Sequence, residues 1–104
     1  MNKQKNDGLS AYGFNLFQNY PNPFNPETEI KYYIPKDSKI NIKVYDVTGK
    51  IIDELVNEYK TIGSHSVHFN SSNLSSGIYY YQIIAFDNYG NETIKISRKM
   101  ILIK

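Results

Sequence analysis

Cysteine is absent from this sequence of 104 residues. Its absence excludes disulfide bonds, thiolate metal sites and thiol nucleophiles. It does not settle the cellular compartment, because many exported bacterial domains also lack cysteine. A chain of this length forms one domain and can bury a modest core without covalent cross-links.

A strong charge bias and long hydrophobic runs are also lacking. The net charge is only +2, and the lysines are scattered singly along the chain, which argues against nucleic-acid binding. No segment approaches the roughly 20 apolar residues of a membrane span, so we expect no membrane insertion. Residues 1–13 contain no apolar segment of the signal-peptide kind. If the chain is exported, its signal peptide must therefore lie on a larger parent protein, and we expect the chain to be a fragment of such a parent.

Helical periodicity is missing too, and the pattern that is present is the two-residue alternation of β-strands. Ile30, Tyr32 and Ile34 alternate with more polar residues, and residues 40–45 repeat the pattern. Strands are predicted over residues 14–18, 29–34, 40–47, 50–56, 64–70, 78–87 and 93–103. This spacing predicts an all-β fold, a seven-stranded immunoglobulin-like antiparallel β-sandwich, over residues 13–104. Residues 1–12 are expected to be a linker or tail, and residues 57–63 a loop.

Two local features refine this prediction. Gly49 follows Thr48 between two predicted strands, where glycine accepts the positive φ of a tight turn. In the following strand the alternation is broken by Asp53 and Glu54, which indicates a β-bulge or an edge position.

Three of the four prolines lie within residues 20–26, and we call these residues the proline segment. Proline fixes φ and removes a backbone donor, so this spacing forbids a helix and disfavours a central strand. We expect a stiff segment attached to the core by Tyr20 and Phe24, with Asn22 and Asn25 hydrogen bonding to nearby backbone.

Four ordered blocks carry a family resemblance: residues 16–35 (LFQNYPNPFNPETEIKYYIP), 42–50 (IKVYDVTGK), 74–81 (LSSGIYYY) and 99–104 (KMILIK). Together they resemble the C-terminal sorting domain of the type IX secretion system of the Bacteroidetes and related phyla. A more distant resemblance links the chain to the immunoglobulin-like domain of flagellar hook-capping proteins. The motif residues with a structural role are Tyr20, Pro21, Asn22, Pro23, Phe24, Asn25, Pro26, Gly49, Gly77 and Tyr79.

The resemblance implies a function in protein transport. It implies an immunoglobulin-like, non-catalytic module that directs an upstream passenger through the periplasm to the cell surface or the medium. The implied partners are the type IX translocon and a sortase-like peptidase, and we expect a monomer. The implied sorting signal is Lys99, Met100, Ile101, Leu102, Ile103 and Lys104. Within it, Met100 and Leu102 share one face of the last strand, and Ile101 and Ile103 share the other.

The sequence offers little that could act as a catalytic or metal site. His65 and His68 are three apart on a predicted strand and so face opposite sides, which disfavours a shared metal. A triad of Ser66, His65 and Asp53 fails because adjacent residues on one strand cannot face each other. We therefore expect no enzyme activity, no metal and no cofactor.

The strand over residues 78–87 predicts a second candidate site. One face of this strand carries Tyr79, Tyr81, Ile83 and Ala85. The other face is also too apolar to be simply exposed to solvent. Tyr45, Tyr80, Ile84 and Phe86 are therefore a candidate partner surface. Two alternatives remain: the tail, the proline segment or the loop over residues 57–63 covers these residues, or the rings stack on sugar. The second would make the chain a carbohydrate-binding module of a secreted hydrolase. A separate alternative for the whole chain is a structural immunoglobulin-like accessory module of such a protein.

Overall fold

The computed structural model describes residues 9–104, and these residues form strands and turns without any helix. No helix in this part of the chain could therefore span a membrane. The strands are β1 (Leu9–Ala11), β2 (Phe14–Leu16), β3 (Glu27–Ile34), β4 (Ser38–Tyr45), β5 (Ile51–Lys60), β6 (Gly63–Asn70), β7 (Gly77–Phe86) and β8 (Glu92–Leu102). Each of the seven expected strands has a counterpart. An eighth, β1, lies within the range expected to be a tail, and residues 1–8 of that range lie outside the described residues.

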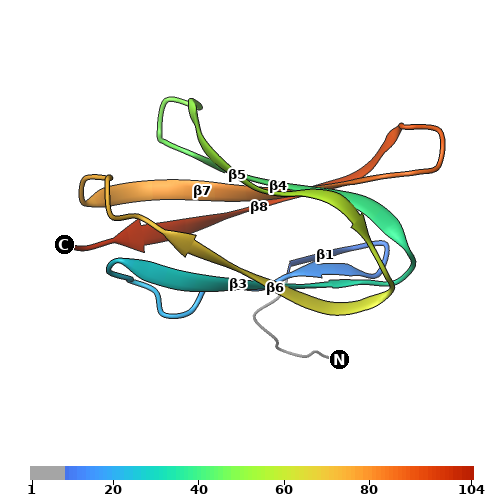
Figure 1. The fold of residues 1–104 in the computed structure, drawn as a ribbon, viewed down its shortest axis with the longest axis horizontal. Helices are drawn as coiled ribbons and strands as arrows, with labels where there is room; N and C mark the ends of the chain where they lie inside the picture. The colour runs from blue at the N-terminus through green and yellow to red at the C-terminus, as the bar shows by residue number, and fades with distance from the viewer. Residues whose placement is uncertain (1–8) are drawn as a thin grey trace.

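The strands form two antiparallel sheets that lie one above the other (Figure 1). One sheet has the order β1-β2-β3-β6, and the other has the order β5-β4-β7-β8. Strand β4 pairs with β7, and this pairing places Tyr45 opposite Tyr80. Strands β5 and β8 are therefore the edges of the second sheet.

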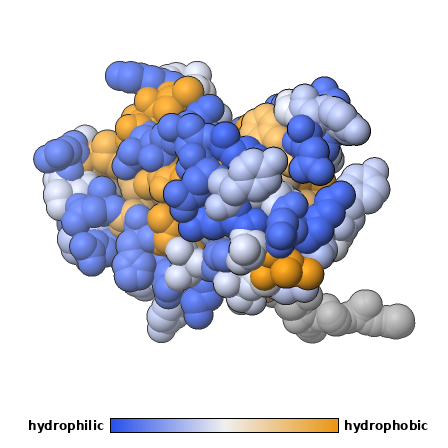
Figure 2. Space-filling view, turned by 45° about the vertical axis from the view of Figure 1, so that its right-hand side comes forward, coloured by the Kyte–Doolittle hydropathy of each residue, from blue (hydrophilic) through white to orange (hydrophobic). Residues whose placement is uncertain are grey.

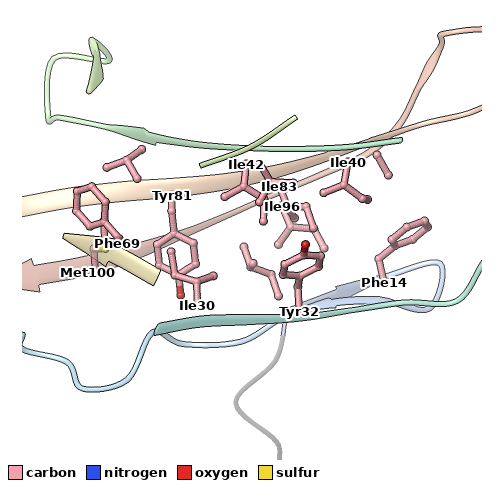
Figure 3. Close-up of a cluster of buried hydrophobic side chains, with 14 of the residues drawn as sticks. Phe14, Ile30, Tyr32, Ile40, Ile42, Phe69, Tyr81, Ile83, Ile96 and Met100 are labelled. Carbon is pink, nitrogen blue, oxygen red and sulfur yellow. The ribbon is translucent and has the colours of Figure 1, made fainter. Parts of the chain in front are cut away.

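The core lies between the two sheets, where alternate residues of β3, β4, β7 and β8 are buried. In Figure 3, Ile30 and Tyr32 from β3 point toward Tyr81 from β7. All three side chains are at most 1% exposed. Burying a large apolar side chain in this way contributes roughly 1.5–3 kcal/mol. The alternation expected from the sequence for β3, β4 and β7 is confirmed.

Strand β5 is longer than the sequence predicts, and the loop expected over residues 57–63 is wrong. The strand continues to Lys60, and only residues 61–62 separate it from β6. Residues 57–60 are largely polar, but an edge strand needs few buried side chains to keep its ladder. The expected irregularity is present, because the register with β4 shifts between Ile42 and Lys43 and between Val44 and Tyr45.

The turn between β4 and β5 is built by one carboxylate and one glycine. Oδ1 of Asp46 accepts hydrogen bonds from the backbone N–H of Thr48 at 2.8 Å and of Lys50 at 3.1 Å. A further bond from the Thr48 hydroxyl, followed by these backbone donors, lowers the pKa of Asp46. Gly49 has φ +88°, as expected for this turn.

Candidate functional site

The last strand, β8, alternates between the core and the surface. Met100 and Leu102 are buried between the sheets, whereas Ile101 is half-buried and Ile103 is 55% exposed. This is the alternation that the sequence predicts. Because β8 is at the edge of its sheet, its outer backbone groups need partners from elsewhere.

The proline segment supplies these partners. Phe24 forms a parallel bridge with Leu102. Its backbone N–H donates to the Ile101 carbonyl oxygen at 3.0 Å, and its carbonyl oxygen accepts from the Ile103 N–H at 3.1 Å. A short piece of the proline segment thus acts as one further strand beside the end of β8.

Two side chains extend this pairing along β8. Asn22 Oδ1 accepts a hydrogen bond from the Ile101 N–H at 2.9 Å. Gln18 Nε2 donates to the Lys99 carbonyl oxygen at 2.8 Å. We call these contacts between residues 18–24 and 99–103 the edge contact. It occupies backbone groups on which another strand would otherwise pair.

The proline segment is attached to the core mainly by Phe24. The Phe24 ring is 2% exposed and lies 6.1 Å from the Phe69 ring, measured between centroids. Tyr20, in contrast, is 81% exposed, so the expectation that its ring attaches the segment is wrong. Tyr20 contributes through its backbone, which exchanges two hydrogen bonds of 2.9 Å with Glu29.

A buried polar network holds the chain just before the proline segment. The Tyr81 hydroxyl donates to the Phe17 carbonyl oxygen at 2.6 Å and accepts from the Asn19 N–H at 2.8 Å. Asn19 is 1% exposed, and its Nδ2 donates to the Pro21 carbonyl oxygen at 3.1 Å and to Thr28 Oγ1 at 3.0 Å. Burial raises the pKa of Tyr81 to about 12.

The turn before β7 meets the same end of the molecule. Lys104 donates from its backbone N–H to Ser76 Oγ at 2.9 Å and from Nζ to the Ser72 carbonyl oxygen at 2.8 Å. Gly77 pairs with Leu102, and the largely buried Tyr79 donates from its hydroxyl to the Ser75 carbonyl oxygen at 2.7 Å. The first, third and fourth sequence blocks therefore converge on the end of β8.

The predicted partner surface is divided in two on the outer face of the second sheet. Tyr45 and Tyr80 are cross-strand neighbours and border a shallow hollow of about 400 Å³. Ile84 and Phe86 lie farther along β7 and border a different hollow, of about 500 Å³. On the side of the molecule that Figure 2 shows, hydrophobic atoms reach the surface in separate areas between hydrophilic ones.

The described parts of the three segments that could have covered these residues lie elsewhere or join the sheet, and residues 1–8 of the tail lie outside the described residues. Residues 9–11 pair with β2 in the other sheet, and the proline segment lies along β8. Residues 57–60 continue β5, and Tyr59 borders the same hollow as Phe86.

The structure does not assemble a catalytic or metal site from the histidines. His65 stacks on Tyr32 with 5.4 Å between ring centroids, while His68 is exposed on the opposite face, 3.7 Å from Glu29. Ser66 faces away from His65, and Asp53 lies in the other sheet. Across residues 9–104 no three His, Cys, Asp or Glu side chains gather in a way that could hold a metal ion.

Sequence reasoning missed the polar residues that hold the edge contact in place. These residues are Gln18, Asn19, Thr28 and Arg98. The Nη1 atom of Arg98, for example, donates to the Leu16 carbonyl oxygen at 3.1 Å. A strand pattern treats such residues as solvent-facing, and their buried or cross-sheet partners are far away in the sequence. Only the position of Asn19 directly before the proline segment could have indicated a role.

Comparison with known proteins agrees with this arrangement. The family model described as secretion system C-terminal sorting domain matches residues 18–103, which include both the proline segment and β8. No curated protein matches the chain. Domains of this family are non-catalytic signals for type IX secretion, attached to an upstream passenger that is exported toward the cell surface or the medium. Because the match spans well over half of the sequence, the chain belongs to the family of secretion system C-terminal sorting domains.

Proposed function

We propose that residues 99–104 are the part of this sorting module that the type IX translocon recognises, and that they act while folded at the end of β8. The observation that carries this proposal is the edge contact, through Phe24 and Asn22, in a chain that matches the sorting family. A segment held in this way presents a defined set of side chains. Ordering it before recognition also lowers the entropy cost of binding.

The finer features of the module follow from the same proposal. The two sheets form an immunoglobulin-like sandwich whose seven core strands are β2 to β8, with β1 as an addition at one edge. The module is a monomer without enzyme activity. It passes through the periplasm, and a sortase-like peptidase then removes it from the passenger. The antiparallel pairing of the neighbouring strands and the single core support the sandwich, and membership in the sorting family supports the export steps.

The test is export of a fluorescent passenger fused to this chain in a bacterium with a type IX system. Deleting residues 99–104 alone is ambiguous, because it also removes Met100 and Leu102 from the core. The decisive variant is therefore Lys99→Glu combined with Lys104→Glu, which changes exposed side chains and leaves the core intact.

We expect this double variant to retain its melting temperature and to lose most of its export. Lys31→Glu, which changes an exposed lysine of β3, is the matched control and should be exported normally. Normal export of a folded double variant would contradict the role of residues 99–104. Failure of the parent fusion to be exported would contradict the sorting function itself.

A carbohydrate-binding role has one observation in its favour. Tyr59, which is 61% exposed, borders the 500 Å³ hollow together with Phe86 and three amide side chains, Asn41, Asn57 and Asn88. Aromatic and amide groups at one site suit a sugar. Titration with soluble polysaccharides, read by the change in tyrosine fluorescence, tests this role. Binding that Tyr59→Ala abolishes would support it, and an absence of binding would remove it.

A further inference from the structure

The outer face of the second sheet carries an apolar surface at the same end as residues 99–104. Tyr45 is paired with Ile51 on one side and with Tyr80 on the other, and Ile78 is paired with Ile101 in the next row. Directly opposed residues of this kind have side chains about 5 Å apart. With Val47, these residues make up what we call the apolar face: Tyr45, Val47, Ile51, Ile78, Tyr80 and Ile101.

This face is open to solvent although its residues are large and hydrophobic. Val47 is 67% exposed, Ile51 is 52% exposed and Ile78 is 40% exposed. Tyr45, Val47 and Tyr80 also border the hollow of about 400 Å³. Contiguous apolar surface on a small domain commonly marks a protein-binding site.

Two lysines and one carboxylate lie around the apolar face, so its charge is positive on balance. Lys99 is directly opposite Tyr80, and Lys50 follows the turn that carries Val47. Neither lysine makes a salt bridge within residues 9–104. One carboxylate, Asp46, also borders the hollow, where three hydrogen bonds from its own turn hold it in place. The rim therefore favours a partner with carboxylates at matching positions.

Addition of a partner strand to the end of β8 is blocked. The outward backbone groups of Ile101 and Ile103 already pair with the proline segment. Strand addition, the usual way to bind an exposed sheet edge, needs those groups to be free. Recognition at this end therefore has to use the side chains on the sheet face.

We propose that the partner of this module docks on the apolar face, and that it is a protein of the secretion machinery with an apolar surface bordered by acidic residues. This inference rests on the proposed function and specifies the surface that acts in it. The apolar face also brings together the second and fourth sequence blocks, which the edge contact does not connect. Val47 and Lys50 lie in the second block, and Ile101 lies in the fourth. A linear tail would present Ile101 without them.

The experiment measures export of the fluorescent fusion for variants of exposed residues. Val47→Asp and Tyr80→Asn change the apolar face, while Ile62→Asp and Tyr89→Asn change hydrophobic residues that are 57% and 89% exposed elsewhere. We expect both face variants to lower export about tenfold or more, as loss of a central interface residue does. We expect the two controls to remain within about twofold of the parent. Melting temperatures confirm that each variant is folded.

A competition measurement separates docking from folding and from the sorting function. The chain without a passenger is exported to the periplasm together with the parent fusion. The parent sequence should compete and lower export of the fusion, whereas the Val47→Asp sequence should not. If folded face variants are exported and compete normally, docking on the apolar face is overturned, while the sorting function remains intact. Higher export of Asn22→Ala, which weakens the edge contact, would also overturn it, because recognition would then use an uncovered strand.

Discussion

Phe24 and Leu102 form a parallel β-bridge that joins the first and the last motif of the sequence. Two backbone hydrogen bonds of Phe24, to Ile101 and from Ile103, flank this bridge. The proline segment therefore closes the edge of β8. A rigid segment suits this role, since less conformational entropy is lost when it is ordered.

Asn22→Ala tests the side-chain part of the edge contact. The change removes the acceptor of the Ile101 N–H, which is 2.9 Å away. We expect the free energy of unfolding to fall by about 1 kcal/mol, the typical contribution of one such bond. Hydrogen exchange at the Ile101 amide should also become faster. Asn88→Ala, in the exposed turn after β7, is the control and should change neither quantity.

Met100→Ala and Ile103→Ala separate the two sides of the last segment. Met100 is fully buried, so its truncation leaves a cavity, and we expect a loss of about 2–5 kcal/mol in unfolding free energy. Ile103 is 55% exposed, and we expect a change below about 1 kcal/mol. Urea denaturation measures both. Equal losses would show that Ile103 is packed as firmly as Met100, contrary to the structure.

Tyr81→Phe tests the buried hydroxyl beneath the proline segment. The variant leaves the buried Asn19 N–H and the partly buried Phe17 carbonyl oxygen without their partner. We expect a loss of about 1–3 kcal/mol at neutral pH, measured by urea denaturation. Tyr20→Phe, at an exposed ring, should change stability little and serves as the control.

The same hydroxyl makes stability depend on alkaline pH. Burial raises the pKa of Tyr81 to about 12, above its ordinary value of 10. Below pH 10 the group is protonated in both the folded and the unfolded state, so its contribution is complete. As the pH rises from 10 to 12, the unfolded state loses the proton first, and stability falls by about 2–3 kcal/mol. Thermal melting across this range should show a smaller decline in Tyr81→Phe. An identical decline would assign the effect to other groups.

Gly49→Val tests the turn between β4 and β5. The φ of +88° is costly for a side chain branched at Cβ, although no atom lies within 4 Å of an added Cβ. We expect a loss of about 1–2 kcal/mol from the backbone alone. Gly49→Asn should cost less, because asparagine tolerates positive φ. Melting temperatures compare the two variants, and an equal loss in both would point to a contact rather than to the backbone.

The alternation of apolar and more polar residues was enough to predict the strands that line the core. Ile30, Tyr32 and Ile34 show why, since a two-residue period places all three on one face of a strand wherever that strand lies. The turn at Gly49 could be predicted from equally local information, since it depends only on the residues next to the glycine. Strand β1 and the second half of β5 were missed because short or polar edge strands carry little of this pattern.

The sequence by itself therefore determined the all-β class, the faces of the central strands, the glycine turn and the presence of four family motifs. Only the tertiary structure decided that Phe24 pairs beside Leu102, that Asn19 and Tyr81 support that pairing, and that Tyr45 and Tyr80 lie on the same sheet face as Lys99. The physical reason is that strand period and turn geometry act between near neighbours in the chain. Edge pairing, buried hydrogen bonds and shared surfaces instead depend on which distant segments the core brings together.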